Sequence, residues 1–228
     1  MKIYEVGGCV RDKLLGKEAN DFDHVITGAT PDEMLRLGFK QVGKNFPVFL
    51  KDGQEYALAR QEIKTGDKHS DFKFIFTPDI TLQQDLERRD FTCNALMQDV
   101  LTSEIIDHFG GVNDLNNKIL RHINDETFIE DPLRVLRAAQ FASRFNFNIA
   151  DETLRLCASM DINTLSRERI YLETEKALLK AEKPSVYFEI LRKMDKLSYW
   201  FSELQDLIGI KQKSRLFSVP FNACDAVV

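Results

Sequence analysis

The 228-residue sequence has few of the features that stabilise secreted, membrane-spanning or metal-stapled proteins. Its four cysteines stand singly, which excludes the paired spacing of a zinc site or a disulfide framework and is typical of buried thiols in a reducing compartment. No stretch of about 18 apolar residues occurs, and the first residues form no long apolar segment, so neither a membrane span nor a secretion signal is indicated. We therefore expect a cytoplasmic protein that has no membrane partner.

A strong excess of one charge is also missing. The chain carries 31 Lys and Arg against 36 Asp and Glu, a formal net charge of -5. The acidic surplus lies in residues 1–115, which hold 14 basic and 20 acidic side chains, whereas residues 116–228 hold 17 and 16. This balance excludes a protein that is basic throughout, but local clusters of cations can still form a surface for a polyanion.

Turn signals divide the first half of the chain into short apolar runs, and this pattern predicts strands mixed with helices. The runs that have the character of strands are 3–6, 23–26, 46–50 and 56–59. Asp52-Gly53 favours the tight turn of a hairpin between the last two runs. A helix is expected after Thr30, because threonine is a favoured cap residue and Pro31 suits the first helical position.

From Asp131 onward, apolar residues recur at helical spacing, which predicts an all-helical second half. The polar segment 63–73 contains glycine and is expected to form a mobile loop between strands. The sequence therefore predicts an α+β fold. Its expected units are a head with a small mixed sheet, a helical neck and body, and a divergent tail, at residues 1–115, 116–208 and 209–228.

The glycine pair Gly7 and Gly8 follows a predicted strand and precedes Arg11. Glycines let the backbone approach a ligand closely, helix-terminal N–H groups attract an anion, and the forked guanidinium of Arg11 suits phosphate. The alternative is a simple strand-to-helix turn, because two glycines and an arginine form a weak pattern.

Asp21 and Asp23 come directly before the apolar run His24-Val25-Ile26. On a strand, residues i and i+2 face the same side, so these two carboxylates are expected to lie side by side. Two anions this close repel one another unless a cation joins them, and Mg²⁺ typically takes one or two carboxylates together with substrate phosphate oxygens. The alternative is a pair of exposed loop aspartates.

In combination, the two patterns favour a nucleotidyl transferase. Metal ions held by the aspartate pair could activate a hydroxyl nucleophile and neutralise a pyrophosphate leaving group. The sequence contains no G-x-x-x-x-G-K-[ST] motif, which excludes the chemistry of a kinase-type P-loop.

Five ordered motifs extend this pattern along the chain. They are Gly7-Gly8-x-x-Arg11-Asp12, Asp21-x-Asp23, Arg88-Arg89-Asp90-Phe91-Thr92-x-Asn94-Ala95, Asp107-x-x-Gly110-Gly111-x-x-Asp114-Leu115 and Glu130-Asp131-Pro132-Leu133-Arg134-x-Leu136-Arg137-Ala138-Ala139. In this order the sequence resembles the class II tRNA nucleotidyltransferases, the family of the bacterial CCA-adding enzymes within the DNA polymerase β superfamily. The resemblance covers residues 1 to about 210.

The resemblance implies a polymerase β-like head in which Asp21 and Asp23 are catalytic and hold Mg²⁺. It also implies that Gly8 and Arg11 contact the triphosphate of the nucleotide. The full set of nucleotide-binding positions that match the family's motifs is Gly8, Arg11, Arg89, Asp90, Asp131, Arg134 and Arg137.

Asp131 and Arg134 are expected to share one helix face at i and i+3, where an acceptor and a forked donor suit the edges of a base. The alternative is a surface salt bridge. By resemblance, this pair selects CTP and ATP without a nucleic-acid template. Gln140 stands where the family usually has arginine, so nucleotide affinity or the switch between C and A is expected to differ. Arg169 and Glu173 are expected to brace their helix.

The implied function is template-independent addition of C and A to the 3′ end of tRNA from CTP and ATP, with pyrophosphate release and Mg²⁺ as cofactor. A poly(A) polymerase and an enzyme that adds only CC or only A share these motifs and remain alternatives. A nonenzymatic nucleotide- or RNA-binding protein is the alternative of another class, because the resemblance stops after about Gly209 and Gln140 replaces an arginine.

Overall fold

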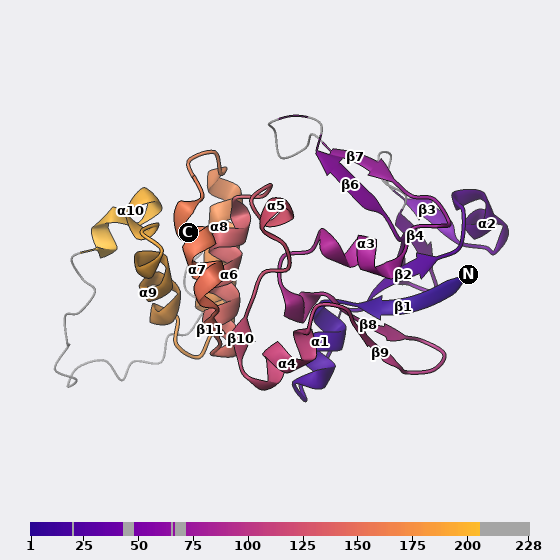
Figure 1. The fold of residues 1–228 in the computed structure, drawn as a ribbon, viewed down its shortest axis with the longest axis horizontal. Coiled ribbons are helices and arrows are strands. Elements are labelled where there is room, and N and C mark those ends of the chain that lie inside the picture. The colour runs from indigo at the N-terminus through magenta and orange to yellow at the C-terminus, as the bar shows by residue number, and fades with distance from the viewer. Residues whose placement is uncertain (20, 43–47, 65, 67–71, 206–228) are drawn as a thin grey trace, which may run out of the picture.

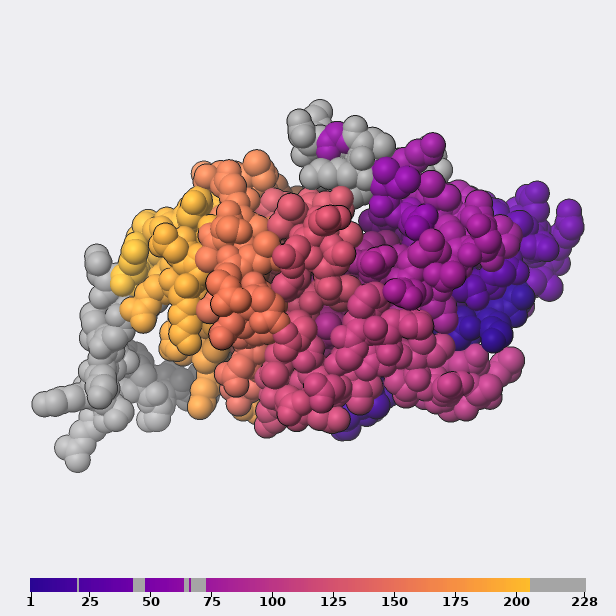
Figure 2. All heavy atoms as spheres, viewed as in Figure 1, coloured from indigo at the N-terminus to yellow at the C-terminus, as the bar shows by residue number. Residues whose placement is uncertain are grey.

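The structure is a computed structural model that describes residues 1–205 apart from 20, 43–47, 65 and 67–71. A seven-stranded sheet lies at one end of the molecule and a group of helices at the other (Figure 1). In Figure 2, the orange and yellow helical residues and the indigo and purple strand residues form opposite ends of one continuous body. This arrangement confirms the predicted α+β class.

The strands of the main sheet follow the order β3-β4-β5-β2-β1-β8-β9. They are β1 (Lys2–Val6), β2 (Asp23–Thr27), β3 (Lys40–Val42), β4 (Val48–Lys51), β5 (Gln54–Leu58), β8 (Leu96–Asp99) and β9 (Ile105–Asp107). Strands β2 and β5 run parallel, and the other neighbours in this sheet are antiparallel. The predicted hairpin between β4 and β5 is confirmed, and both turn residues, Asp52 and Gly53, have positive φ angles (52° and 77°) as a tight hairpin turn requires.

The sheet is buried on both faces, because successive side chains of a strand point to opposite sides. On β2, Val25 belongs to one apolar cluster, with Tyr4 and Met97, and Ile26 belongs to another, with Phe49. The helices of this part of the chain are α1 (Gly8–Leu14), α2 (Pro31–Arg36), α3 (Leu82–Glu87), α4 (Gly111–Asn116) and α5 (Asp125–Phe128), with the 3₁₀ turn η1 (Thr92–Asn94).

The predicted start of α2 is confirmed. The side chain of Thr30 accepts a hydrogen bond from the backbone N–H of Glu33, and the Glu33 carboxylate accepts one from the backbone N–H of Thr30. This reciprocal capping box satisfies two backbone donors that the first helical turn leaves free. Pro31 occupies the first turn, as expected.

The other end of the molecule consists mainly of helices. They are α6 (Leu133–Phe145), α7 (Asp151–Ser159), α8 (Arg167–Lys180), α9 (Ser185–Lys193) and α10 (Leu197–Trp200), followed by the 3₁₀ turn η2 (Ser202–Leu204). The prediction that the second half is all helix was wrong at one place, because β10 (Ile119–Leu120) and β11 (Asn148–Ile149) pair in parallel. Asn146 ends α6 in the left-handed conformation, so the chain turns back and runs beside residues 119–120.

The predicted loop at residues 63–73 was too long. Its first and last residues belong to β6 (Gln61–Lys64) and β7 (Phe72–Ile75), which pair as antiparallel arms outside the main sheet. Cross-strand pairing of the backbone therefore overrides the polar composition of the segment. Residues 65 and 67–71 of that prediction, and the whole predicted tail at 209–228, lie outside the described residues.

The predicted head and neck share one apolar core. Cys9, Val10 and Phe91 from the first half are buried in the same cluster as the helical residues Leu136 and Tyr187. The Phe91 ring lies edge-on to Phe128 and Phe141, with ring centroids 5.6 and 5.8 Å away. Along the described part of the chain, no helix is long and apolar enough to cross a membrane.

Candidate active site

A cavity of about 600 Å³ lies between the sheet and helix α6. Side chains from α1, β2, α6 and α8 and from the segment between α3 and η1 reach it. All nine residues that the sequence predicts for the site line this one cavity, although they span more than a hundred positions of the chain. They are Gly8, Arg11, Asp21, Asp23, Arg89, Asp90, Asp131, Arg134 and Arg137.

Gly7 and Gly8 form the turn from β1 into α1. Gly7 has φ 74° and ψ -120°, a conformation that L side chains rarely adopt. A Cβ atom at Gly7 would lie 3.1 Å from Nη1 of Arg89, and one at Gly8 would lie 3.5 Å from Nη2 of Arg11. The glycine pair therefore lets the backbone lie against two guanidinium groups of the cavity.

Arg11 is held on its edges and on its faces. Its Nε and Nη2 contact Oδ1 of Asp12, both at 2.8 Å, and its Nη1 donates a hydrogen bond of 2.5 Å to Oδ1 of Asn94. The rings of Phe141 and Phe145 have their centroids 5.3 and 4.6 Å from its Cζ. These contacts fix the orientation of a side chain that is only 4% exposed, so Arg11 offers a preorganised cation at the cavity wall.

Asp21 and Asp23 are both exposed and line the cavity. Asp23 is the first residue of β2, whereas Asp21 lies before the strand, so the prediction that both stand on the strand was wrong for Asp21. Neither carboxylate forms an ion pair with a described side chain. Two unpaired carboxylates are a donor set that suits Mg²⁺, which needs one or two such groups besides substrate oxygens and water. Among the described residues, no group of three or more His, Cys, Asp or Glu side chains is placed to hold a metal ion.

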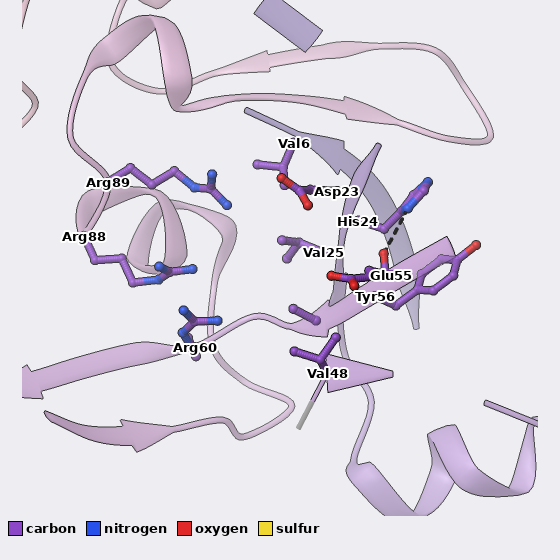
Figure 3. Close-up of a pocket in the computed structure, with 11 residues that line it drawn as sticks. Val6, Asp23, His24, Val25, Val48, Glu55, Tyr56, Arg60, Arg88 and Arg89 are labelled. Carbon is purple, nitrogen blue, oxygen red and sulfur yellow. Dashed lines mark hydrogen bonds between the residues drawn. The ribbon is translucent and has the colours of Figure 1, made fainter. Parts of the chain in front are cut away.

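A second hollow, of about 270 Å³, adjoins the cavity and shares Asp23, Arg88 and Arg89 with it. Figure 3 shows the guanidinium groups of Arg60, Arg88 and Arg89 pointing toward the β2 and β5 strands, from which Asp23 and Glu55 extend. Asp23 and Glu55 are register partners on these parallel strands. The carboxylates of Asp23 and Glu55 on these strands and the guanidinium groups of the three arginines therefore line the same hollow.

Arg89 and Asp90 follow helix α3 and differ in how fully they are paired. Nη2 of Arg89 lies 3.7 Å from the buried carboxylate of Asp85, and its Nε has no hydrogen-bond partner among the described residues. Burial lowers the pKa of Arg89, which still leaves an arginine charged at neutral pH. Asp90 has both oxygens in use: Oδ1 accepts from the backbone N–H of Phe91 and from Asn94, and Oδ2 accepts from Arg137.

The contact between Asp90 and Arg137 is strong and largely buried. Nε and Nη2 of Arg137 lie 2.8 and 2.5 Å from Oδ2 of Asp90. Burial by itself would raise the pKa of Asp90, but Arg137 and Asn94 outweigh it and hold the pKa below its usual range. Asp90 therefore stays ionised and fixes the orientation of Arg137 on α6.

Asp131 and Arg134 do not share a helix face as predicted, because α6 begins at Leu133 and Asp131 precedes it. Nη2 of Arg169, on α8, contacts both oxygens of Asp131, at 3.0 and 2.9 Å. Nη1 and Nη2 of Arg134 donate to the backbone carbonyl oxygens of Thr127 and Arg88, each at 2.6 Å. The pair still meets in the cavity, but contacts with other segments, rather than helical spacing, hold each side chain in place.

Gln140, which stands where the family usually has arginine, is buried outside the cavity. It is 2% exposed, does not line the cavity, and its Nε2 has no hydrogen-bond partner among the described residues. Arg169 braces Asp131, and Glu173 lies beside Lys176 and within 4.0 Å of Arg137. Residues of α8 therefore brace two cavity residues, Asp131 and Arg137.

Three further polar residues line the cavity that were not predicted for the site: Arg88, Asn94 and Arg144. Arg144 lies one helical turn beyond Phe141, and the spacing of 134, 137, 141 and 144 on one face of α6 was the signal that could have found it. Its Cζ lies 4.8 Å from the centroid of the Phe145 ring, which Arg11 and Lys17 also contact. Burial and the nearby Arg11 lower the pKa of Arg144, so this part of the wall is a concentration of positive charge suited to a polyanion.

Comparison with known proteins places this geometry in a family. The family model described as the poly A polymerase head domain matches residues 3–121. The chain is 50% identical over 218 residues to the Multifunctional CCA protein of Haemophilus ducreyi, and the match covers 92% of this chain and 52% of that protein. The chain thus spans about half the length of the curated relatives it matches.

Solved structures resemble the fold over most of its length. A tRNA-processing enzyme with CTP matches with a TM-score of 0.67 and 32% identity, covering 87% of this chain and 54% of that one. A tRNA nucleotidyltransferase complexed with a primer tRNA and an incoming ATP analog also has a TM-score of 0.67 and 32% identity, with coverage of 87% and 58%. Because the matching family model spans more than half of the 228 residues and includes the glycine turn, the aspartate pair and Arg89, the chain belongs to the poly A polymerase head domain family.

Proposed function

We propose that the chain catalyses template-independent addition of C and A to the 3′ end of tRNA, using CTP and ATP and releasing pyrophosphate. In this proposal residues 1–115 form the catalytic head, and residues 116–208 form a neck and body that contribute nucleotide-selecting residues. The acceptor end of tRNA is the partner, Mg²⁺ is the cofactor, and the reaction belongs to the cytoplasm.

The observation that carries the proposal is the composition of the 600 Å³ cavity. It combines two carboxylates that form no ion pair with a described side chain, the preorganised cation Arg11, and two side chains, Asp131 and Arg134, that can contact a base. Phosphoryl transfer depends mainly on positioning and on neutralising charge, and these residues supply both. The relatives named for CCA activity and for complexes with CTP, tRNA and an ATP analog support the same assignment.

Each group of residues has a separate task in this reaction. Gly8 leaves room for the triphosphate beside Arg11, and Arg11 binds its oxygens with the N–H groups that Asp12 and Asn94 do not use. Arg134 donates to a backbone oxygen through each Nη, so three of its five N–H groups remain for a base. Base selection by fixed protein groups requires no template.

Asp21 and Asp23 would hold the metal. When bound there, Mg²⁺ lowers the pKa of the attacking 3′-hydroxyl and neutralises charge on the leaving pyrophosphate. Asp23 is held by its place as the first residue of β2, and Asp21 lies just before that strand. Both carboxylates line the same cavity, so a cation bound there would offset the charge of both.

The experiment incubates the protein with Mg²⁺, labelled CTP or ATP, and tRNA that ends before the first C, before the second C, or before the A. We expect stepwise extension, and a loss of about a thousandfold in rate when Asp21→Asn and Asp23→Asn are combined, since the metal contributes several kcal/mol. The matched control is Glu189→Gln, which removes an exposed carboxylate from α9, far from the cavity lining.

The products also separate the other functions. Extension beyond the first A would indicate a poly(A) polymerase, and addition of only CC or only A would indicate a partial enzyme. Binding of CTP without extension of any of the three tRNAs would contradict the proposal and identify a nucleotide-binding protein. A nucleotide-binding protein without catalytic activity is the main alternative, because the chain matches only about half the length of its relatives.

A further inference from the structure

Asn94 connects two charged residues of the cavity that lie far apart in the sequence. Its Oδ1 accepts a hydrogen bond of 2.5 Å from Nη1 of Arg11, and its Nδ2 donates one of 3.0 Å to Oδ1 of Asp90. Arg11, Asp90 and Asn94 are 4%, 7% and 7% exposed, so water does not compete strongly for these contacts. The side-chain amide therefore lies between a cation and an anion and is paired with both.

An asparagine suits this position because its amide has an acceptor at one end and donors at the other. Aspartate has nearly the same shape, but it would present a second carboxylate to Asp90 and would form an ion pair with Arg11. Alanine would leave the buried Nη1 of Arg11 without its acceptor. In either case Arg11 would lose its present orientation or its free positive charge.

The connection continues from Asp90 to the helical end of the molecule. Oδ2 of Asp90 accepts two hydrogen bonds from Arg137 on α6, and Nη1 of Arg137 lies 4.0 Å from Glu173 on α8. Arg11 belongs to α1, which follows the first strand of the sheet. The chain of contacts Arg11, Asn94, Asp90 and Arg137 thus joins the sheet end to the helical end across the cavity wall.

We propose that Asn94 is a positioning residue for nucleotide binding: it fixes the guanidinium of Arg11 that receives the triphosphate and couples it through Asp90 to Arg137. The inference rests on the proposed function, because it takes a nucleoside triphosphate as the ligand. Its specific consequence is that a change at Asn94 weakens binding of the phosphates and leaves binding of the base and ribose unchanged.

The test measures binding of CTP and of cytidine by calorimetry, with Mg²⁺ and without RNA. The variants are Asn94→Asp, Asn94→Ala and the matched control Asn163→Asp, an exposed asparagine in the segment between α7 and α8. We expect Asn94→Asp to weaken CTP about tenfold, because the new carboxylate would hold Arg11 in an ion pair and cost one charge-assisted hydrogen bond from Arg11 to the phosphates. Binding of cytidine should change less than twofold. Asn163→Asp should bind both ligands as the unchanged protein does.

Three results would overturn the inference, and they are distinguishable. Equal weakening of CTP and cytidine would show that Asn94 only maintains the fold, and unchanged CTP binding in both Asn94 variants would show that it does not position Arg11. If the unchanged protein binds no CTP, the proposed function fails as well. The near-isosteric Asn94→Asp variant keeps the test valid if Asn94→Ala does not fold.

A double-mutant cycle tests the coupling. Arg11→Lys and Arg137→Lys keep the charges but remove the forked hydrogen bonds. We expect their effects on CTP affinity to be non-additive in the protein with Asn94, because residues in one hydrogen-bond network interact, and additive when Asn94→Asp is also present. The same coupling in both backgrounds would overturn the proposed link.

Discussion

At the scale of single residues, the cavity contains arginine side chains that contacts with their neighbours hold in one orientation. Arg11 is enclosed by Asp12, Asn94 and two phenyl rings, and Arg137 is fixed by Asp90. A side chain that is already ordered loses less conformational entropy when a ligand binds. The same reasoning applies to the backbone at Gly7, whose angles bring the chain close to Arg89.

Replacement of Gly7 by alanine should damage both the fold and the site. The new Cβ would require a disfavoured backbone conformation and would lie 3.1 Å from Nη1 of Arg89. We expect a loss of about 1–3 kcal/mol in the free energy of unfolding, measured in urea, together with weaker CTP binding.

The matched control for this prediction is Gly16→Ala. Gly16 also has a positive φ, 66°, but a Cβ there meets no atom within 4 Å. We expect Gly16→Ala to lower stability by about 1 kcal/mol and to leave CTP binding intact. Equal losses of CTP affinity in both variants would show that the contact with Arg89 has no importance for the site.

At the scale of helices and strands, α8 holds the start of α6 in place. Arg169 contacts both carboxylate oxygens of Asp131, directly before α6 begins, and Glu173 lies one turn further along the same face, near Arg137. These two arginine-carboxylate contacts, one just before α6 and one within it, fix the rotation of α6 as well as its distance from α8. The position of the base-contacting residues therefore depends on α8 as much as on α6.

Arg169→Gln should reduce the selectivity for the base. Without the Nη2 group of Arg169 that contacts both of its oxygens, the half-buried Asp131 can adopt other rotamers, at a cost of about 1–3 kcal/mol in the contact it makes with a base. We expect incorporation of UTP or GTP to rise about tenfold or more relative to CTP and ATP in primer-extension assays. Arg167→Gln, which changes an exposed arginine on the same helix, is the control. Unchanged selectivity in Arg169→Gln would show that Asp131 does not need this partner.

Local signals in the sequence predicted local structure. The cap at Thr30 and the turn at Asp52-Gly53 were identified because each depends on residues only a few positions apart. The contact of Arg11 with Asn94 spans 83 positions and that of Asp131 with Arg169 spans 38, and neither leaves a periodic signal. The motifs therefore predicted which residues meet in the cavity, but not which of them hold the others in place.

At the scale of the whole molecule, contacts between distant parts of the sequence join the predicted head and neck. The motif order suggested two units, at residues 1–115 and 116–208, yet the apolar cluster that contains Phe91 extends into the helices. The cavity lies at this junction, so its two walls keep their relative position only while the shared core is intact. Stability and site geometry should therefore respond together to changes in this core.

Phe91→Ala provides the test of that coupling. Phe91 is fully buried, and its ring packs edge-on against Phe128 and Phe141, so its removal should cost about 3–5 kcal/mol. Trp200, the only tryptophan in the sequence, reports unfolding of the helical end by fluorescence, and hydrogen exchange of peptides from β4 and β5 reports the sheet end.

We expect Phe91→Ala to lower the denaturant midpoint of both probes by the same amount, because the shared core makes the two ends unfold as one cooperative unit. The comparison variant is Phe49→Ala, which removes an equally buried ring from the cluster on the far part of the sheet. If the molecule unfolds as a single cooperative unit, Phe49→Ala must also lower the denaturant midpoint that Trp200 fluorescence reports. A shift confined to the sheet peptides in Phe49→Ala would show instead that the sheet end opens by itself, in which case the cavity could lose one wall while the helices remain folded.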